Sequence, residues 1–164
     1  MLTAGTNILT ARRERVGGVV DVPPLGHEAM RRAGVVWLRA GNRSAGCPVP
    51  AWVLWRDGAA YLVTGPGEQP APGLVHTAGT DGTGGTEVAY HAEVTVASTR
   101  TASRIVTWQA AVSRVEPGSE QWRAVVPALA SRRLNLTDPD ATQARWANEC
   151  AVLRLDPTGE FHEA

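Results

Sequence analysis

Two apolar runs that meet at an Asp-Gly pair constrain the fold of this chain more than any other feature. Residues 50–64 have the sequence PAWVLWRDGAAYLVT, with Asp57 and Gly58 at the centre. A type I′ hairpin turn needs positive φ at both central positions, and Asp-Gly is a strongly preferred pair there. The sequence therefore predicts an antiparallel hairpin with a two-residue loop.

The register of this hairpin follows from the loop length. Arg56 lies opposite Ala59, and extension of the same pairing places Trp52 opposite Val63. Both faces of the hairpin are then mostly apolar, so neither can lie in water. We expect one face to pack on a core and the other to be covered by a helix or by a second subunit.

Alternation and capping patterns predict the remaining elements. Ser119 caps a helix whose apolar positions follow helical spacing, and Pro127 is expected to kink or split it. A long connection spans residues 65–86. Six or seven strands with few helices predict a mainly β (α+β) fold, a closed antiparallel barrel. The expected elements are a helix over 26–34, strands over 35–40, 74–77, 86–98, 103–116 and 150–155, a helix after Ser119 with Trp122, Val125, Val126 and Leu129 on one face, and a short helix over 143–148.

Length and charge limit the organisation and the partners. The 164 residues fit one domain, with an N-terminal extension over 1–25, the barrel over 26–156 and a polar tail over 157–164. Sixteen basic and sixteen acidic residues cancel, which argues against nucleic acid or a membrane as partner. All basic residues are Arg, so chemistry that needs a lysine amine is excluded. A small molecule or another protein is the expected partner.

Neither the cysteines nor the histidines form a motif. Cys47 and Cys150 have no CxxC spacing and are expected to be free thiols in a reducing cytoplasm. The first 16 residues lack the apolar segment of a signal peptide, and no apolar run reaches the length of a membrane span, which also favours the cytoplasm. The four histidines have no metal-ligand spacing. His91 and Glu93 are interpreted as polar residues on the outer face of a strand.

The order of these elements resembles the pyridoxamine 5′-phosphate oxidase-like split β-barrels. The similarity covers residues 26–136: a short helix, a strand, a Pro-led apolar strand, a DG-type turn, a strand ending in Thr-Gly, two long strands and a helix ending in Arg-Arg-Leu-Asn. The resemblance implies a homodimer that binds FMN or a deazaflavin cofactor in the groove between subunits. A second subunit would also account for a hairpin that is apolar on both faces.

The resemblance also implies where a cofactor phosphate would be bound. The first hairpin strand of the family's oxidases carries two cations, and this chain keeps only the second, at Arg56, because Ala51 stands near the first. Thr64 matches the threonine that bonds the phosphate, with Gly65 after it. Glu68 and Gln69 replace the cationic loop, which disfavours a phosphate at the usual place. A bound flavin would then need Arg56 together with Arg100 or Arg104, or backbone N–H groups of the Gly-rich loop. The expected cofactor-binding residues are Arg56, Thr64, Gly65, Trp55 and Arg104.

The aromatic residues and the two possible functions stay open at the level of sequence. Six tryptophans against one Phe and two Tyr serve either the core and a dimer interface or a wall on which a planar ligand stacks. One functional class is a flavin- or deazaflavin-dependent oxidoreductase acting on a small organic molecule, for which no catalytic acid or base is identified. The other is a cofactor-free dimeric barrel that binds a small apolar or planar ligand or a partner protein.

Overall fold

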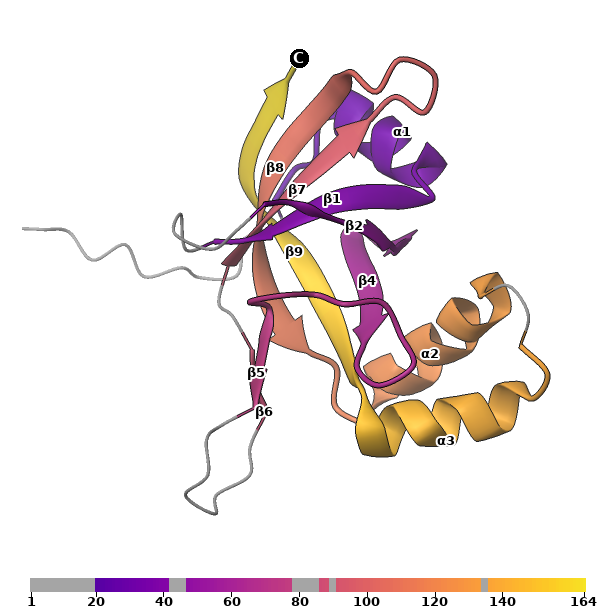
Figure 1. Cartoon of the computed structure of the whole chain (residues 1–164). Coiled ribbons are helices and arrows are strands. Elements are labelled where there is room, and N and C mark those ends of the chain that lie inside the picture. Colours follow the sequence, from indigo (N-terminus) through magenta and orange to yellow (C-terminus); the bar gives the residue numbers. More distant parts are fainter. Residues whose placement is uncertain (1–19, 42–46, 78–85, 89–90, 134–135) are drawn as a thin grey trace, which may run out of the picture.

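The computed structural model describes residues 20–41, 47–77, 86–88, 91–133 and 136–164 (Figure 1). Within these residues three helices accompany two antiparallel sheets. The helices are α1 (Pro24–Arg32), α2 (Glu120–Arg132) and α3 (Pro139–Glu149). The strands are β1 (Val35–Ala40), β2 (Val49–Trp52), β3 (Leu54–Arg56), β4 (Ala59–Thr64), β5 (Val75–Thr77), β6 (Thr86–Val88), β7 (His91–Ala97), β8 (Arg104–Arg114) and β9 (Ala151–Glu163).

The main sheet curls into a barrel. Its seven strands follow the order β2-β1-β7-β8-β9-β4-β3, and every neighbouring pair is antiparallel. The two edge strands, β2 and β3, are consecutive in the chain and are separated only by Val53. The two ends of the sheet must therefore approach each other, which gives a curled, split-barrel arrangement, although β2 and β3 do not pair with each other. β5 and β6 form a separate two-stranded sheet.

Two apolar clusters hold this architecture together. One fills the barrel, where alternate residues of β1, β7 and β8 point inward, including Leu38, Val94 and Trp108. The other lies between α2 and the outer side of β3 and β4. The helix covers the second apolar face of the hairpin, so this face needs no second subunit. The four apolar residues predicted for α2 are all buried: Trp122, Val125, Val126 and Leu129.

The Asp-Gly hairpin is confirmed near its turn and differs further out. Asp57 and Gly58 have φ values of 50° and 74°, and Arg56 pairs with Ala59. The predicted pair of Trp52 with Val63 is wrong, because Trp52 pairs with Val35. The pairing ends at Leu54, since the chain passes at Val53 from one edge of the curled sheet to the other.

The C-terminal strand is longer than predicted. β9 continues to Glu163, well beyond the end at residue 155 that the sequence predicted for the last strand. The strand passes Pro157 with an irregularity in its pairing to β8, where the missing N–H of proline is tolerated. The ring of Phe161 then stacks on Trp108 with centroids 5.8 Å apart. Burial against this ring explains why the chain end joins the sheet.

Helix caps account for other differences from the predicted elements. The Asp138 carboxylate accepts the N–H groups of residues 140 and 141, so α3 begins well before residue 143. The Ser119 hydroxyl caps α2 as predicted, and that helix is continuous across Pro127. The strand predicted over 86–98 consists of β6 and β7, and residues 89–90 between them lie outside the described residues.

Candidate functional site

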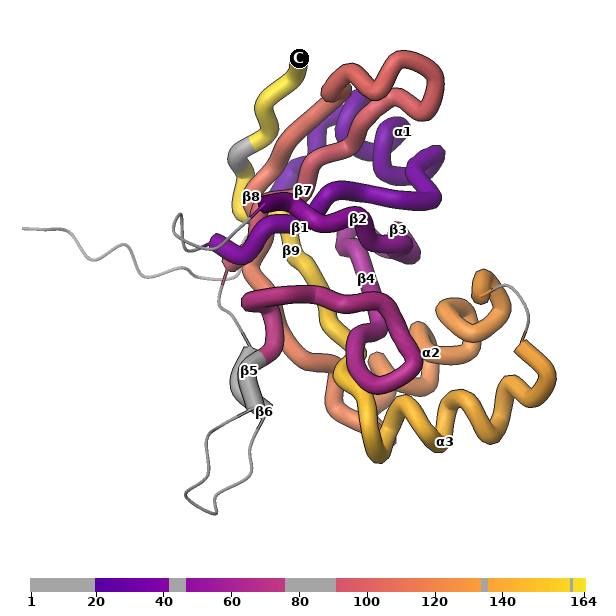
Figure 2. The backbone as a smooth tube through the Cα atoms, viewed as in Figure 1, coloured from indigo at the N-terminus to yellow at the C-terminus, as the bar shows by residue number. Residues whose placement is uncertain are grey.

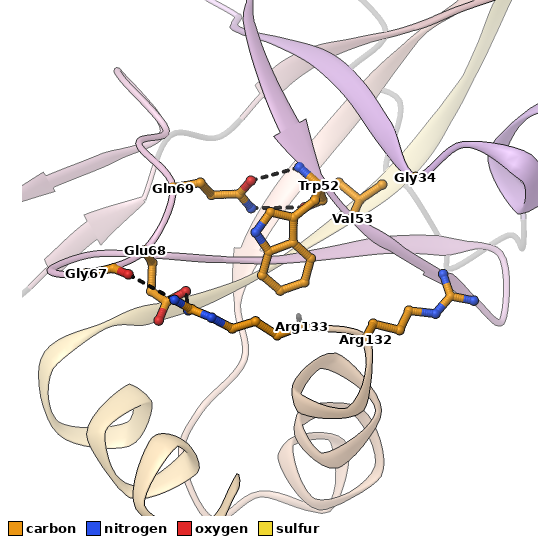
Figure 3. A pocket seen from close by; sticks show the side chains of 8 residues that line it. All are labelled: Gly34, Trp52, Val53, Gly67, Glu68, Gln69, Arg132 and Arg133. Atoms are coloured by element: carbon orange, nitrogen blue, oxygen red, sulfur yellow. Dashed lines mark hydrogen bonds and ion pairs between the residues drawn. The ribbon is translucent and has the colours of Figure 1, made fainter. Parts of the chain in front are cut away.

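A cavity of about 470 Å³ lies where the edge of the barrel meets the end of α2. Figure 3 shows the indole of Trp52 in its wall, between Gln69 and the two arginines that end α2. Its volume falls within the range of small-molecule sites. Residues from four segments line the cavity: Gly34, Trp52, Val53, Gly67, Glu68, Gln69, Arg132 and Arg133.

Hydrogen bonds fix the loop that follows β4 against β2. The Gln69 side chain accepts the backbone N–H of Trp52 at 2.7 Å and donates to its carbonyl oxygen at 2.9 Å. The hydroxyl of Thr64, which is buried, donates to the carbonyl oxygen of Gln69 at 2.9 Å. Gly65 has a φ of 142°, and a Cβ there would lie 2.9 Å from the Cα of Cys150. The chain past β4 (Figure 2) is therefore held as a rigid wall of the cavity.

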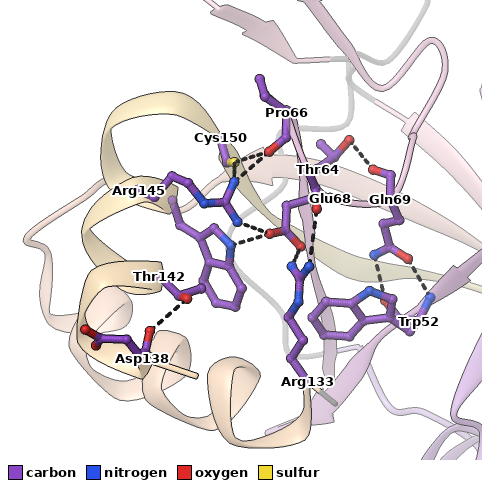
Figure 4. A network of polar contacts seen from close by, with 12 residues as sticks. Trp52, Thr64, Pro66, Glu68, Gln69, Arg133, Asp138, Thr142, Arg145 and Cys150 are labelled. Atoms are coloured by element: carbon purple, nitrogen blue, oxygen red, sulfur yellow. Dashed lines mark hydrogen bonds and ion pairs between the residues drawn. The ribbon is translucent and has the colours of Figure 1, made fainter. Parts of the chain in front are cut away.

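Glu68 is a buried anion with partners from two helices (Figure 4). Its side chain is 1% exposed. Oε1 accepts from Arg145 and from Trp146 Nε1, the latter at 2.8 Å, while Oε2 accepts from Arg133. Arg133 also donates to the carbonyl oxygen of Gly67. This ion network, which consists of Glu68, Arg133, Arg145 and Trp146, ties the loop to α2 and α3.

The ion network changes the electrostatic argument made from the sequence. The loop itself supplies no cation, as expected, but the fold supplies Arg133 and Arg145 from elsewhere in the chain. With Arg132, three positive groups lie on or near this wall against the one carboxylate of Glu68. The charge of Glu68 is therefore balanced by arginines from other parts of the chain, while the expectation that this loop disfavours a phosphate stays a prediction.

The two arginines of the cavity wall point in different directions. In Figure 3, Arg133 extends toward Glu68 and Gly67, whereas Arg132 extends the other way. Arg132 is exposed. Among the described residues no side-chain ion pair or hydrogen bond engages its guanidinium. Arg132 is thus the cation of this wall that is available to a ligand.

The sequence-predicted cofactor set is not gathered around this cavity. Thr64 and Gly65 hold the loop that forms its wall, as described above. Arg56 instead donates to the carbonyl oxygen of Ala124 on α2, at 2.8 Å. It pairs with the first residue of β4, and a rise of about 3.3 Å per residue sets its backbone about 16 Å from that of Thr64 at the other end.

The remaining predicted residues also lie apart from the cavity. Trp55 packs edge-on against Trp108, with centroids 6.0 Å apart, and against His27. Arg104 begins β8 and is exposed, as is Arg100 in the turn before it. Within the described part of the chain, no side-chain hydrogen bond, ion pair or aromatic pair joins these side chains to the residues of the cavity wall. Their participation in cofactor binding stays a prediction.

Five residues that line the cavity were not predicted as site residues from the sequence: Gly34, Val53, Gly67, Arg132 and Arg133. Trp52 was one of the tryptophans for which a ligand-stacking wall stayed open. The two arginines were visible as a pair at the end of a helix, but their position there already had an explanation in the helix dipole. Trp52 was expected to lie opposite Val63, which would have placed it in the hairpin. No local signal marked Gly34.

An apolar surface adjoins the cavity on the outer face of the sheet. Val35 and Trp37 of β1 are 53% and 43% exposed. They pair with Trp52 and Pro50 of β2, so these four side chains lie on one face, here called the outer apolar face. Trp52 belongs both to this face and to the cavity wall. The cavity and the outer apolar face are therefore continuous.

Among the residues that the structure describes, the other titratable groups form no second cluster. Burial raises the pKa of the Cys150 thiol, against the opposing effect of the nearby Arg145. Within the described ranges, no three His, Cys, Asp or Glu side chains lie close enough together to hold a metal ion. None of the described helices is both long and apolar enough to cross a membrane.

Comparison with known proteins identifies the fold. No protein-family model matches the sequence, and no curated protein is significantly similar to it. The structure of the heme storage protein HutZ from Vibrio cholerae superposes with a TM-score of 0.59 at 16% identity, over 83% of this chain and 89% of HutZ. An F420 reductase gives 0.56 at 15% identity, over 87% of this chain and all of the reductase. A candidate pyridoxamine 5′-phosphate oxidase from Listeria innocua gives 0.50 at 11% identity, over 83% of this chain and 92% of that protein. The chain therefore has the split-barrel fold of the pyridoxamine 5′-phosphate oxidase-like proteins, with a sequence that has diverged far from them.

Proposed function

We propose that this protein binds a flavin or deazaflavin cofactor in the cavity beside Trp52 and serves as an oxidoreductase for a small organic molecule. The cavity itself is the observation that carries the proposal. It combines an indole face, a rigid loop and a free cation, which suit a planar ring with an anionic side chain. An F420 reductase of the same fold supports this proposal by its name. The name of HutZ refers to heme, so it supports only the more general statement that this fold holds planar cofactors.

We further propose that a second copy of the chain completes the site. Val35 and Trp37 leave apolar area in water that a partner would bury. Because Trp52 joins the outer apolar face to the cavity, a partner on this face would also close the groove over a bound ring. The homodimer expected from the family resemblance fits this arrangement.

The roles of the protein groups follow from their positions. A bound flavin or deazaflavin would supply the hydride chemistry. Trp52 would orient its ring by stacking, and the loop held by Gln69 would keep that contact fixed. Burial of the outer apolar face would exclude water from the groove.

A cofactor-free barrel is the second candidate, and one observation favours it. The charged side chain of the loop after β4, Glu68, is bound in the internal ion network. The loop therefore has no charged side chain left to contact a ligand. A cavity of this kind could hold an apolar or planar molecule without catalysis. A cofactor-free barrel would bind its ligand equally well with and without a flavin present.

An absorption spectrum of the purified protein after addition of FMN and removal of the excess on a sizing column distinguishes the two functions. The proposal predicts a flavin band that elutes with a dimer-sized peak. A colourless protein after FMN addition, and equally after addition of F420, would refute cofactor binding and leave the second candidate.

Substitution on the outer apolar face tests the homodimer separately. Trp37→Glu places a charge on this face while the interior of the barrel is untouched, since Trp37 points outward. The variant should elute as a folded monomer with weakened flavin binding. A wild-type protein that is monomeric throughout the concentration range of analytical ultracentrifugation would contradict the dimer.

A further inference from the structure

We propose that Arg132 is the residue that binds the anionic group of the cavity ligand, so that the site selects a planar molecule bearing a phosphate or carboxylate over the uncharged form of the same ring. This inference rests on the proposed function and specifies its ligand. It assigns the phosphate to the end of α2, whereas the family resemblance would assign it to a strand cation at Arg56.

Arg133, the other arginine of the cavity wall, is already bound within the protein. Its guanidinium donates to the Glu68 carboxylate and to the carbonyl oxygen of Gly67. Transfer of Arg133 to a ligand would leave Oε2 of Glu68 buried without a partner, which is costly. Arg133 is thus a positioning residue that holds the loop carboxylate in its internal ion pair.

The Glu68 carboxylate cannot compete with an anionic ligand for Arg132. Its carboxylate is 1% exposed and is held from the side of α3 by Arg145 and Trp146. Arg132 points in the opposite direction from Arg133 in Figure 3. The charge of Arg132 is therefore not cancelled by the network that neutralises its neighbour.

The cavity wall near the start of β1 also leaves room for a ligand. Gly34 lines the cavity together with Arg132, and a Cβ built on Gly34 meets no heavy atom within 4 Å. The indole of Trp52 provides a flat apolar surface in the same cavity. A ring against Trp52 with an anionic substituent that reaches Arg132 matches this distribution of apolar surface and charge.

A comparison of FMN with riboflavin tests the inference, because the two differ only in the phosphate. Dissociation constants are measured by fluorescence titration for the wild-type protein, for Arg132→Ala and for a control, Arg123→Ala. The control removes Arg123, an exposed arginine of the same helix. This arginine donates a hydrogen bond to the carbonyl oxygen of Gly118, outside the cavity. Thermal unfolding of each variant confirms that it is folded.

Arg132→Ala should change the dissociation constant of FMN and leave that of riboflavin unchanged. Loss of one charged hydrogen-bonding partner should weaken FMN binding to Arg132→Ala by about tenfold or more. Riboflavin binding should stay the same, and Arg123→Ala should behave as the wild type with both ligands. The preference of the wild type for FMN should also decline with increasing salt, since Arg132 is exposed.

The contrary outcomes separate the two proposals. Equal binding of FMN and riboflavin by the wild type would overturn the assignment of Arg132 and leave the flavin function intact. The same holds if Arg56→Ala removes the preference for FMN and Arg132→Ala does not. Failure of the wild type to bind FMN, riboflavin and F420 would refute the proposed function, and the assignment of Arg132 would fall with it.

Discussion

Replacement of Glu68 by alanine should destabilise the whole domain although the residue lies in a loop. Glu68 connects three parts of the chain, because its carboxylate receives Arg133 at the end of α2 and Arg145 and Trp146 on α3. The substitution leaves two arginines facing each other without the anion between them. It also removes the contacts that hold the loop after β4 in place.

The size of the effect follows from burial. Removal of one partner from a buried ion pair typically costs about 3–5 kcal/mol. The side chains of Arg133 and Arg145 are 28% and 33% exposed, so water can partly solvate them after the carboxylate is gone. We therefore expect the lower end, about 3 kcal/mol, which corresponds to a decrease in Tm of about 6–12 °C for a domain of this size.

Urea unfolding followed by circular dichroism measures this loss, and Glu28→Ala provides the matched control. Glu28 also pairs with two arginines, Arg31 and Arg32, but their side chains are 73% and 80% exposed. Such surface pairs contribute about 0.5 kcal/mol or less each. If Glu68→Ala unfolds within about 1 kcal/mol of the wild type, or no further from it than Glu28→Ala, then the buried network does not connect the loop to the helices.

Three further predictions concern the cavity and the thiols. Gly34→Leu should fold normally, since a side chain there enters open space, but the leucine should occupy the cavity and abolish ligand binding. Gly34→Ala should bind the ligand as the wild type does. Loss of thermal stability in Gly34→Leu would contradict the open cavity wall at this position. Burial raises the pKa of Cys150 from its usual value of 9.0, so above that pH the unfolded chain releases a proton that the folded chain retains. Stability should therefore fall as the pH rises past 9, and Cys150→Ala should reduce this decline; an unchanged pH profile of urea midpoints would refute the assignment. In the folded protein a thiol reagent should label the exposed Cys47 at once and Cys150 only on unfolding; equal labelling rates would contradict the burial.

Local patterns in the sequence determined most of the individual elements. The Asp-Gly turn fixed the hairpin from Leu54 to Tyr61, because the loop length alone sets the pairing near a two-residue turn. Alternation placed Val94 and Trp108 inside the barrel, and the Ser119 cap with helical spacing defined the buried face of α2. The order of these elements was sufficient to recognise the split-barrel fold, because fold depends on pattern more than on individual residues.

The candidate site was decided by tertiary structure. At Val53 the chain passes between the two edges of the curled sheet, and this passage brings Trp52 beside Val35 instead of Val63. No local pattern reports such a passage, since it depends on how the whole sheet closes.

The charges of the site were likewise identified by the sequence but brought together only by the tertiary structure. From the sequence Glu68 was an anion in a loop without cations, which is a correct statement about neighbours along the chain. In the folded protein Arg133 and Arg145, which lie 65 and 77 residues away in the sequence, surround it. Electrostatic energy depends on distance in space, so the sequence could identify the charged residues but only the packing of α2 and α3 against the loop could determine their sum.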